Sequence, residues 1–268
     1  MQHLNIDIET RSSVNISKSG AYKYAQSEDF EILLFSYKLN NGPTILVDLK
    51  QGEKIPDNIL ELLNSQNCIK HAYNAAFEWY CLNQAGYTTS ITQWRCTMFH
   101  ATYLGLPAGL GMTGKAIGIP EDKKKLTTGN RLIQYFSVPC KPTKSNGGRT
   151  WNDPHHDLDK WKLYCEYNMQ DVEAEYTIYQ HLKAFEVPAK EQKLWEMDIL
   201  MNANGVKVDK ALVNSVLRID AESTEKLTDE AQKITGLENP NSITQLKSWV
   251  ESQIDEELPG LTKDDISD

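Results

Sequence analysis

The fold is decided by residues 4–10, LNIDIET, in which apolar and polar side chains alternate along the whole run. Alternation with a period of two is typical of a β-strand that has one buried face. The three aliphatic side chains share the buried face, and Asn5, Asp7 and Glu9 share the other. The carboxylates of Asp7 and Glu9 therefore project side by side, about 7 Å apart along the strand.

These two adjacent carboxylates allow two interpretations. Acidic residues at alternate positions are ordinary on the solvated face of a half-buried strand. Like charges repel each other, however, and a cation between them removes that repulsion. Mg²⁺ and Mn²⁺ prefer oxygen ligands of this kind. Asp7 and Glu9 thus form either a plain strand face or part of a metal site.

The segments after the first strand have the order of an α/β domain. Strand patterns occupy residues 31–39, 44–49 and 68–73, and helical spacing occupies residues 55–63 and 74–84. Strands joined first by a hairpin-like turn and then through helices predict a mixed sheet flanked by helices. The fold class expected from this order is α/β.

The second half of the chain is predominantly helical. Residues 140–153 are rich in Pro, Lys, Asn and Gly and predict a loop, which a long helix follows over about residues 157–185. Val187-Pro188 marks the expected end of the first domain, because a residue before proline disfavours the helical conformation. Further helices are expected at about residues 190–203, at about 210–234, and after a cap at 239–242.

Composition excludes several classes of protein. The 268 residues include five scattered cysteines with no Cys-x-x-Cys pair, which excludes a disulfide scaffold and a zinc ribbon. No apolar run approaches the roughly 18 residues of a membrane span, and no signal peptide precedes the first strand. We therefore expect a soluble, cytoplasmic protein without a membrane partner.

The charge is distributed unevenly along the chain. Acidic and basic residues are equal in number up to residue 185, so the formal net charge of -9 lies entirely in residues 186–268. This balance argues against a protein that coats nucleic acid, although an enzyme that takes one strand end into a local groove remains open. The asymmetry predicts two regions with different roles.

Two further motifs place acidic side chains on helices. Tyr167 and Asp171 are four residues apart and share a helix face, where a tyrosine hydroxyl beside a carboxylate can orient water. Asn74, Phe77 and Glu78 follow a strand and open a helix, with Asn74 as the expected N-cap. Each motif also has a purely structural explanation: a half-buried tyrosine beside a surface acid, and an acid that suits the helix dipole.

The order of the three motifs is specific. A strand Asp-x-Glu is followed by Asn-x-x-Phe-Glu and then by Tyr-x-x-x-Asp on a late helix. This order resembles the exonuclease motifs of the DEDDy 3′–5′ exonucleases of the RNase H-like superfamily, and most closely the proofreading domain of phage-type family A DNA polymerases. The resemblance extends to residues 71–79, 94–98, 105–107, 171–172 and 194–250, the last of which resemble the entry to a polymerase thumb.

The resemblance implies a domain organisation and an activity. It implies an RNase H-like exonuclease domain over residues 1–186 and a partial, truncated thumb-like helical segment over residues 187–268. The implied reaction is hydrolysis of DNA 3′ ends, single-stranded or frayed, to nucleoside monophosphates in the bacterial or phage-infected host cytosol. The implied cofactors are two divalent metal ions, Mg²⁺ or Mn²⁺. A polymerase portion absent from this chain is an implied partner.

The resemblance also implies roles for the motif residues. Asp7 bridges both ions, while Glu9 and Asp171 complete the first metal site. Glu78 holds the second ion, and Tyr167 orients the attacking water. This sequence departs from the wider superfamily at Glu78, where aspartate is usual. The charge and ligand type are the same, but the side chain is one methylene longer.

Three neighbouring residues are implied to contact the substrate: Thr10, Asn74 and Phe77. Two other functions remain open, namely an exonuclease of the same type that trims RNA 3′ ends and a non-catalytic nucleic-acid-binding domain. Four intact carboxylates and a tyrosine favour a catalytic domain, because a decayed site usually loses at least one of them.

Three other motifs have simpler explanations. Residues 109–114 match a dinucleotide fingerprint, but helix and loop rather than a strand precede them. The acidic and histidine cluster at 153–159 has metal-ligand types, yet helix initiation after a loop explains it better, with Asp157 or Asp159 as the N-cap. The lysine run at 123–125 is a solvated run or a phosphate contact.

Overall fold

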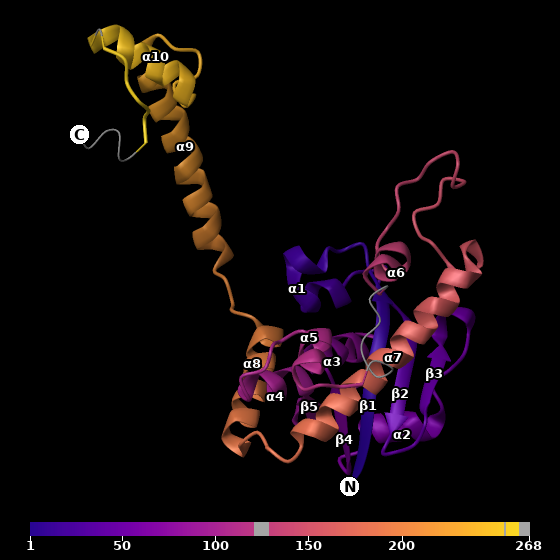
Figure 1. The fold of residues 1–268 in the computed structure, drawn as a ribbon. Helices are drawn as coiled ribbons and strands as arrows, with labels where there is room; N and C mark the ends of the chain where they lie inside the picture. The colour runs from indigo at the N-terminus through magenta and orange to yellow at the C-terminus, as the bar shows by residue number, and fades with distance from the viewer. Residues whose placement is uncertain (121–128, 255, 263–268) are drawn as a thin grey trace. The chain divides into compact units, whose positions relative to one another are not determined.

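The alternating run at the N-terminus forms β1, the central strand of a five-stranded sheet in the computed structural model (Figure 1). The strands are β1 (Gln2–Arg11), β2 (Glu31–Leu39), β3 (Thr44–Asp48), β4 (Cys68–Ala72) and β5 (Trp94–Cys96). Their order is β3-β2-β1-β4-β5. β1 pairs antiparallel with β2 and parallel with β4, and β5 extends the parallel half. This mixed sheet has the strand order of an RNase H-like fold, so the predicted fold class is confirmed.

The structure describes residues 1–120, 129–254 and 256–262, and the lysine run at 123–125 lies outside them. Two compact units divide the chain, Met1–Asn204 and Gly205–Asp268. The helices of the first unit are α1 (Ile16–Ala25), α2 (Asp57–Asn64), α3 (Ala75–Gln84), α4 (Thr97–Tyr103), α5 (Leu110–Ala116), α6 (Gly129–Phe136), α7 (Leu158–Leu182) and α8 (Ala189–Asn204).

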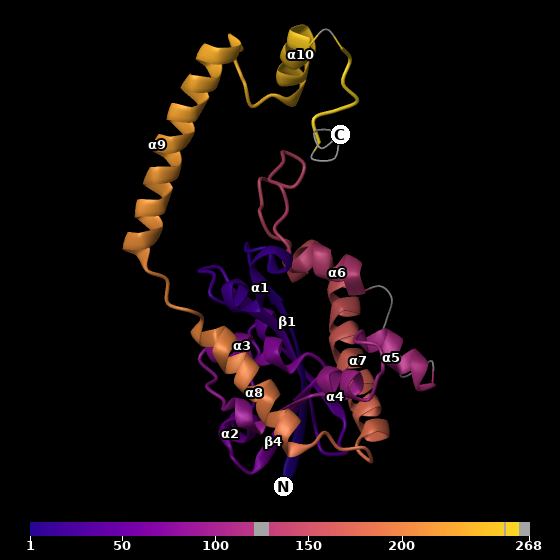
Figure 2. The same ribbon diagram turned by 90° about the vertical axis from the view of Figure 1, so that its left-hand side faces the viewer.

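The two faces of β1 meet different surroundings, as the alternation predicts. Leu4, Ile6 and Ile8 are buried in the larger core cluster, which also takes in residues of α2, α3 and α8. The opposite face of the strand lies against α7, which packs across β1, β2 and β3. Figure 2 shows α3 and α8 on one side of β1 and α7 on the other. The polar side chains of β1 therefore lie between the sheet and the long helix α7.

The long helix α7 begins as the sequence predicts. The Asp157 side chain accepts a hydrogen bond from the Lys160 backbone N–H at 3.0 Å and so caps the helix, which spans 25 residues. Its apolar residues pack in two directions. Trp161 and Tyr164 join Leu132 and Phe136 of α6 in a second core cluster. Residues nearer its C-terminus pack against α4 and α5.

The turn between α7 and α8 contains Val187-Pro188, the expected domain boundary. The first compact unit nevertheless continues to Asn204, because α8 packs onto it. Ile199 of α8 is buried, and its backbone carbonyl accepts a hydrogen bond from the Tyr80 hydroxyl at 3.1 Å. The boundary between compact units thus lies one helix later than the boundary expected from the sequence.

Two short elements of the first unit do not show in the sequence pattern. The helix α1 contains Gly20, whose φ of 76° interrupts the helical backbone, and its helical turns lack a continuous apolar stripe. The strand β5 has only three residues, which is too short for alternation to be visible. The other predicted strands and helices are present within a few residues of their expected ends.

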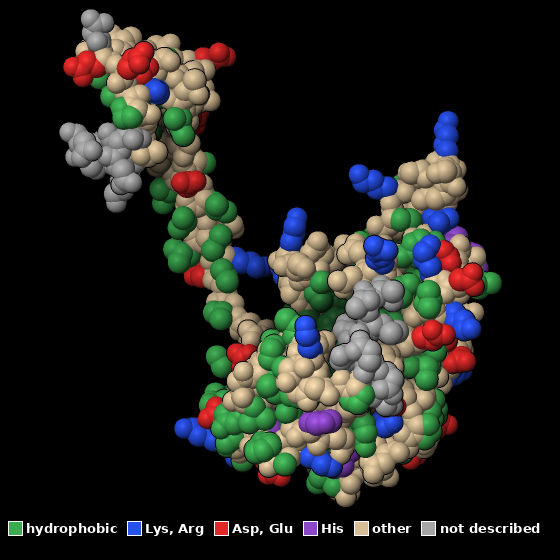
Figure 3. Space-filling model, in the orientation of Figure 1, with side chains coloured by type: hydrophobic (Ala, Val, Ile, Leu, Met, Phe, Trp, Pro, Cys, Tyr) green, Lys and Arg blue, Asp and Glu red, His purple; other side chains and the backbone are tan. Residues whose placement is uncertain are grey.

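The second unit contains α9 (Lys210–Thr235) and α10 (Ile243–Ile254). Asp209 caps α9, and Gly236 ends it with a φ of 70°. Neither helix buries a residue, and apolar side chains lie exposed along α9 (Figure 3). The exposed apolar residues of α9 are Leu212, Val213, Val216, Leu217, Ile219, Leu227 and Ile234. Among the described residues, no helix has the length and apolarity needed to span a bilayer.

Candidate active site

Two carboxylates on the polar face of β1 are held by hydrogen bonds from α7. Asp7 is half-buried, and its Oδ2 accepts a hydrogen bond from Asn168 Nδ2 at 2.6 Å. Glu9 is buried, and its Oε2 accepts one from the Tyr164 hydroxyl at 2.6 Å. Because charged acceptors strengthen such bonds, these contacts fix the direction of both carboxylates.

The matching face of α7 is a polar stripe. Tyr164, Asn168, Asp171 and Glu175 recur at spacings of four, three and four, which places them on one side of a helix. Asn5 of β1 donates from Nδ2 to Glu175 Oε2 at 2.5 Å. The strand residues thus ascend from 5 to 9 as their helix partners descend from 175 to 164. The helix therefore runs antiparallel to β1, and its polar face lies along the polar face of the strand.

A third element, α3, contributes Glu78. Its side chain is 4% exposed, and its Oε2 has no hydrogen-bond partner among the described residues. Burial, and after it the negative charges of Glu175 and Glu9, together raise the pKa of Glu78 to about 8. Glu78 therefore faces the same acidic cluster as the carboxylates of β1 and α7.

Tyr167 links the carboxylates of the cluster. Its side chain is buried and is hydrogen-bonded to Asp171, four residues later on α7. The pKa of Tyr167 is raised by burial and then by the charges of Asp171, Glu9 and Asp7. Three carboxylates from two elements therefore act on the pKa of this one tyrosine. The structure brings together the five residues expected to be catalytic, namely Asp7, Glu9, Glu78, Tyr167 and Asp171, and their catalytic roles remain predictions.

Glu175 is a member of this cluster that sequence reasoning missed. It is buried, accepts hydrogen bonds from the Thr97 hydroxyl and from Asn5, and has its pKa raised by burial to about 7. It is partnered on both oxygens, unlike Glu78. The signal that could have found it is its spacing of four residues from Asp171 on the same helix face.

Three residues are expected to contact substrate, and the structure shows their surroundings. Thr10 is buried, and its hydroxyl is 2.9 Å from the Tyr24 hydroxyl. Asn74 is exposed at the N-cap position of α3, where its side chain makes no capping hydrogen bond. Phe77 is half-buried, with its ring centroid 6.1 Å from that of Tyr24. Their contact with substrate remains a prediction.

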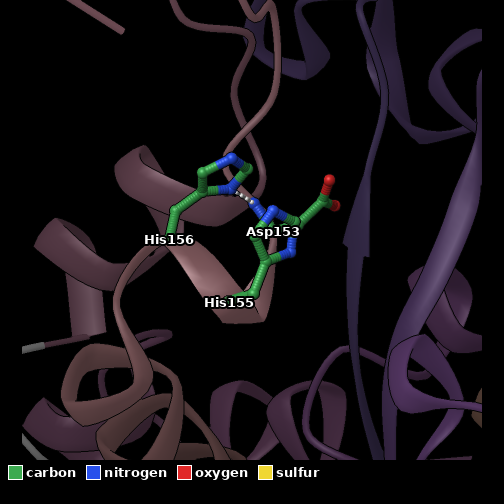
Figure 4. Close-up of side chains that lie close together, drawn as sticks. All are labelled: Asp153, His155 and His156. Atoms are coloured by element: carbon green, nitrogen blue, oxygen red, sulfur yellow. Dashed lines mark hydrogen bonds between the residues drawn. The ribbon is translucent and has the colours of Figure 1, made fainter. Parts of the chain in front are cut away.

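A second cluster of metal-ligand types, Asp153, His155 and His156, lies at the turn before α7 (Figure 4). Its ligand atoms lie within 4.8 Å of one another. The Asp153 carboxylate, however, forms ion pairs with Arg11 at 2.8 Å and with Lys50 at 3.3 Å. Asp153 also donates its backbone N–H to His156 Nδ1 at 2.8 Å. Ion pairing of Asp153 and helix initiation therefore account for this cluster; the sequence predicts the helix initiation but not the ion pairs.

The cluster around Glu78 fits divalent cations better. Its donors are carboxylate oxygens from β1, α3 and α7, the ligand type that Mg²⁺ and Mn²⁺ prefer. Glu78 Oε2 is buried without a hydrogen-bond partner among the described residues, which is costly unless another group satisfies it. The neighbouring negative charges that raise the pKa of Glu78 would be compensated by a cation.

The raised pKa of Glu78 predicts that, without metal, the stability of the folded protein depends on pH. The folded carboxyl titrates at about 8, whereas an unfolded glutamate titrates at about 4.3. Between these values the folded protein binds the extra proton, so its stability in EDTA falls as the pH rises from about 5 to about 8. Glu78→Gln removes this titration, and we expect a shallower decline in melting temperature over that range.

The matched control is Glu61→Gln, which removes one exposed carboxylate from α2. It should leave the slope of melting temperature against pH as it is in the unmodified protein. An unchanged slope in Glu78→Gln would show that this carboxyl does not take up a proton on folding.

Comparison with known proteins gives one strong similarity. Over 269 aligned residues, the chain is 45% identical to a DNA polymerase of Bacillus phage SP02. The alignment takes in 100% of this chain and 41% of that polymerase, so the chain spans less than half of the relative. No family model matches the chain.

Two solved structures are more distantly similar. One is described as the apo form of a nuclease and has a TM-score of 0.41; the other is Brucella melitensis NrnC bound to pGG, with a TM-score of 0.37. Each is 13% identical to this chain and covers 75% of it, and the match takes in 81% of each of those chains.

Proposed function

We propose that the chain contains a metal-dependent 3′–5′ exonuclease that hydrolyses single-stranded or frayed DNA 3′ ends to nucleoside monophosphates, in the manner of a proofreading domain. The observation that carries the proposal is the meeting of four carboxylates from three elements: Asp7, Glu9 and Asp171 surround one buried tyrosine, and Glu78 adjoins them beside Glu9. The whole-chain similarity to a phage DNA polymerase supports DNA as the substrate.

The carboxylate oxygens of Asp7, Glu9, Glu78 and Asp171 would hold two divalent ions, Mg²⁺ or Mn²⁺. When bound, such ions lower the pKa of a water molecule and stabilise the negative charge of the phosphoryl group. The hydrogen bonds from Asn168 to Asp7 and from Tyr164 to Glu9 keep these ligands oriented before any ion arrives.

Tyr167 has a separate role in this proposal. Burial, and after it the carboxylates around the ring, raise the pKa of the hydroxyl, so the phenol stays neutral and does not act as a base. While the hydroxyl is hydrogen-bonded to Asp171, its oxygen still accepts a hydrogen bond. Tyr167 would therefore hold the attacking water by one O–H group and direct the water's lone pair at the terminal phosphate.

The proposal divides the chain by role rather than by packing, since α8 packs onto the first compact unit. Residues 1–186 would form the exonuclease domain, and residues 187–268 would begin a polymerase thumb. The relative is longer than this chain, and the exposed apolar residues of α9 would contact a polymerase portion of the same kind. Thr10, Asn74 and Phe77 would meet the terminal nucleotides, because they border the carboxylates on β1 and α3.

The direct experiment uses a single-stranded DNA oligonucleotide labelled at its 5′ end. With Mg²⁺ or Mn²⁺ we expect a ladder of products that shortens from the 3′ end, with nucleoside monophosphates released, and we expect EDTA to stop it. An RNA oligonucleotide of the same sequence serves as the comparison and should be degraded more slowly.

Other outcomes would contradict specific parts of the proposal. Internal cleavage, or digestion that continues in EDTA, would rule out a metal-dependent exonuclease. Faster degradation of RNA than of DNA would keep the chemistry but assign the site to RNA 3′ ends. Binding without any cleavage would leave a non-catalytic nucleic-acid-binding domain.

A further inference from the structure

The helix α6 packs against α7 through a face that begins with a glycine. Gly129, Leu132 and Phe136 are its buried residues, spaced three and four apart, so they share one side of the helix. Leu132 and Phe136 contact Trp161 and Tyr164 of α7 as part of a core cluster. Gly129 thus occupies a position where an apolar side chain would be expected.

The reason for the glycine is a close approach to Tyr167. A Cβ atom built on Gly129 would overlap Cε2, Cζ and Cδ2 of the Tyr167 ring. An overlap of this extent requires the ring or the helix to move. The edge of the ring that carries the hydroxyl therefore lies directly against the backbone of α6.

Backbone conformation does not explain the glycine. Gly129 belongs to the helix α6, and alanine adopts a helical backbone readily. Alanine is also a better helix former than glycine. On local grounds alone, Gly129→Ala should be neutral or stabilising. Only the contact with Tyr167 opposes it.

The ring of Tyr167 is confined by a second neighbour as well. Its plane is tilted by only 9° from that of Tyr164, with ring centroids 6.3 Å apart. Tyr164 is in turn stacked on Phe136 of α6, with centroids 5.4 Å apart. These contacts and Gly129 together leave the ring little room to shift without losing packing.

We propose that Gly129 is a positioning residue, whose missing side chain lets the Tyr167 hydroxyl reach the carboxylate cluster. The proposal rests on the role of Tyr167 given under the proposed function. A methyl group at position 129 would push the ring away and move the hydroxyl, while the carboxylates of β1 and α3 would stay in place.

The experiment is a double-mutant cycle with two readouts. Gly129→Ala is made alone and together with Tyr167→Phe and with Tyr167→Ala, and kcat and KM on single-stranded DNA are measured with Mn²⁺. The melting temperature is measured separately in EDTA, without substrate. Gly114→Ala is the control, because it adds a methyl group to another buried helical glycine that would meet Ile119 Cδ1 at an ordinary 3.5 Å.

The expected pattern separates positioning from general destabilisation. Gly129→Ala should lower kcat by about 10-fold to 1,000-fold at a similar KM, as losing the hydroxyl does. In the Tyr167→Phe background the same change should have little effect on kcat, because no hydroxyl remains to be displaced. In the Tyr167→Phe background, Gly129→Ala should still lower the melting temperature, because phenylalanine keeps the ring that the new methyl group meets. In the Tyr167→Ala background the ring is gone, so Gly129→Ala should no longer lower the melting temperature.

Failures of the two proposals are distinguishable. An inactive unmodified protein would refute the proposed function, whereas the melting temperatures would still report the contact. An active protein in which Gly129→Ala has the kcat of Gly114→Ala would overturn the positioning role. So would an equal loss of kcat in the tyrosine and phenylalanine backgrounds.

Discussion

Asp171→Asn is expected to lower the turnover of single-stranded DNA by about 1,000-fold or more. Metal ions supply several kcal/mol of transition-state stabilisation, and each 1.36 kcal/mol corresponds to about tenfold in rate. Asparagine keeps the shape and one acceptor of Asp171 but loses the negative charge that would hold an ion. The loss should therefore appear in kcat without loss of the fold, which the melting temperature checks.

Two comparison variants on the same helix sharpen this result. Tyr167→Phe removes the hydroxyl and keeps every carboxylate, so we expect a smaller loss of about 10-fold to 1,000-fold. Asp159→Asn removes an exposed acid from the first turn of α7 and should leave turnover unchanged. Equal losses for Asp171→Asn and Tyr167→Phe would mean that the tyrosine does more than orient water.

Asp7→Asn is expected to abolish the stabilisation that Mn²⁺ gives to the folded protein. A ligand that binds only the folded state stabilises it by about 2.7 kcal/mol at 100 times its dissociation constant. For a unit of this size, that corresponds to a rise of about 5–10 °C in melting temperature. Losing the ligand proposed to bridge both ions should remove most of the rise, as measured by thermal unfolding with and without Mn²⁺.

Without metal, the same substitution should leave the melting temperature level or raise it. Like charges about 4 Å apart repel by about 1–4 kcal/mol between water and a protein surface, and Asp7→Asn removes one of them. Asparagine can still accept the hydrogen bond that Asn168 donates to Asp7. A marked fall in the melting temperature of Asp7→Asn in EDTA would show that Asp7 has a structural role. The acidic face of β1 would then be interpreted as that of an ordinary half-buried strand.

The features visible in the sequence are those set by short-range periodicity. Alternation over residues 4–10 places Asp7 and Glu9 on one face whatever packs against it, and the structure confirms that geometry. The spacing of Tyr167 and Asp171 likewise holds for any helix. Both were predictable because strand and helix geometry alone determine them.

The remaining features depend on which elements cross in three dimensions. The spacing of Glu175 from Asp171 places both on one helix face, but the approach of Glu175 to Glu78 depends on how α3 and α7 pack. Gly129 looks like a helix-end glycine until the Tyr167 ring is seen against it. The first compact unit extends one helix beyond Val187-Pro188, because the proline interrupts the helical run but α8 still packs onto that unit.

The most direct measurement is an anomalous difference map from crystals of the protein soaked in Mn²⁺. We predict two peaks about 3.5–4 Å apart, as in other two-metal sites, bounded by carboxylate oxygens of Asp7, Glu9, Glu78 and Asp171. Crystals of Asp7→Asn should lose one or both peaks. Peaks only at Asp153, His155 and His156, or no bound ion among the four carboxylates, would contradict a metal-dependent nuclease site at this position.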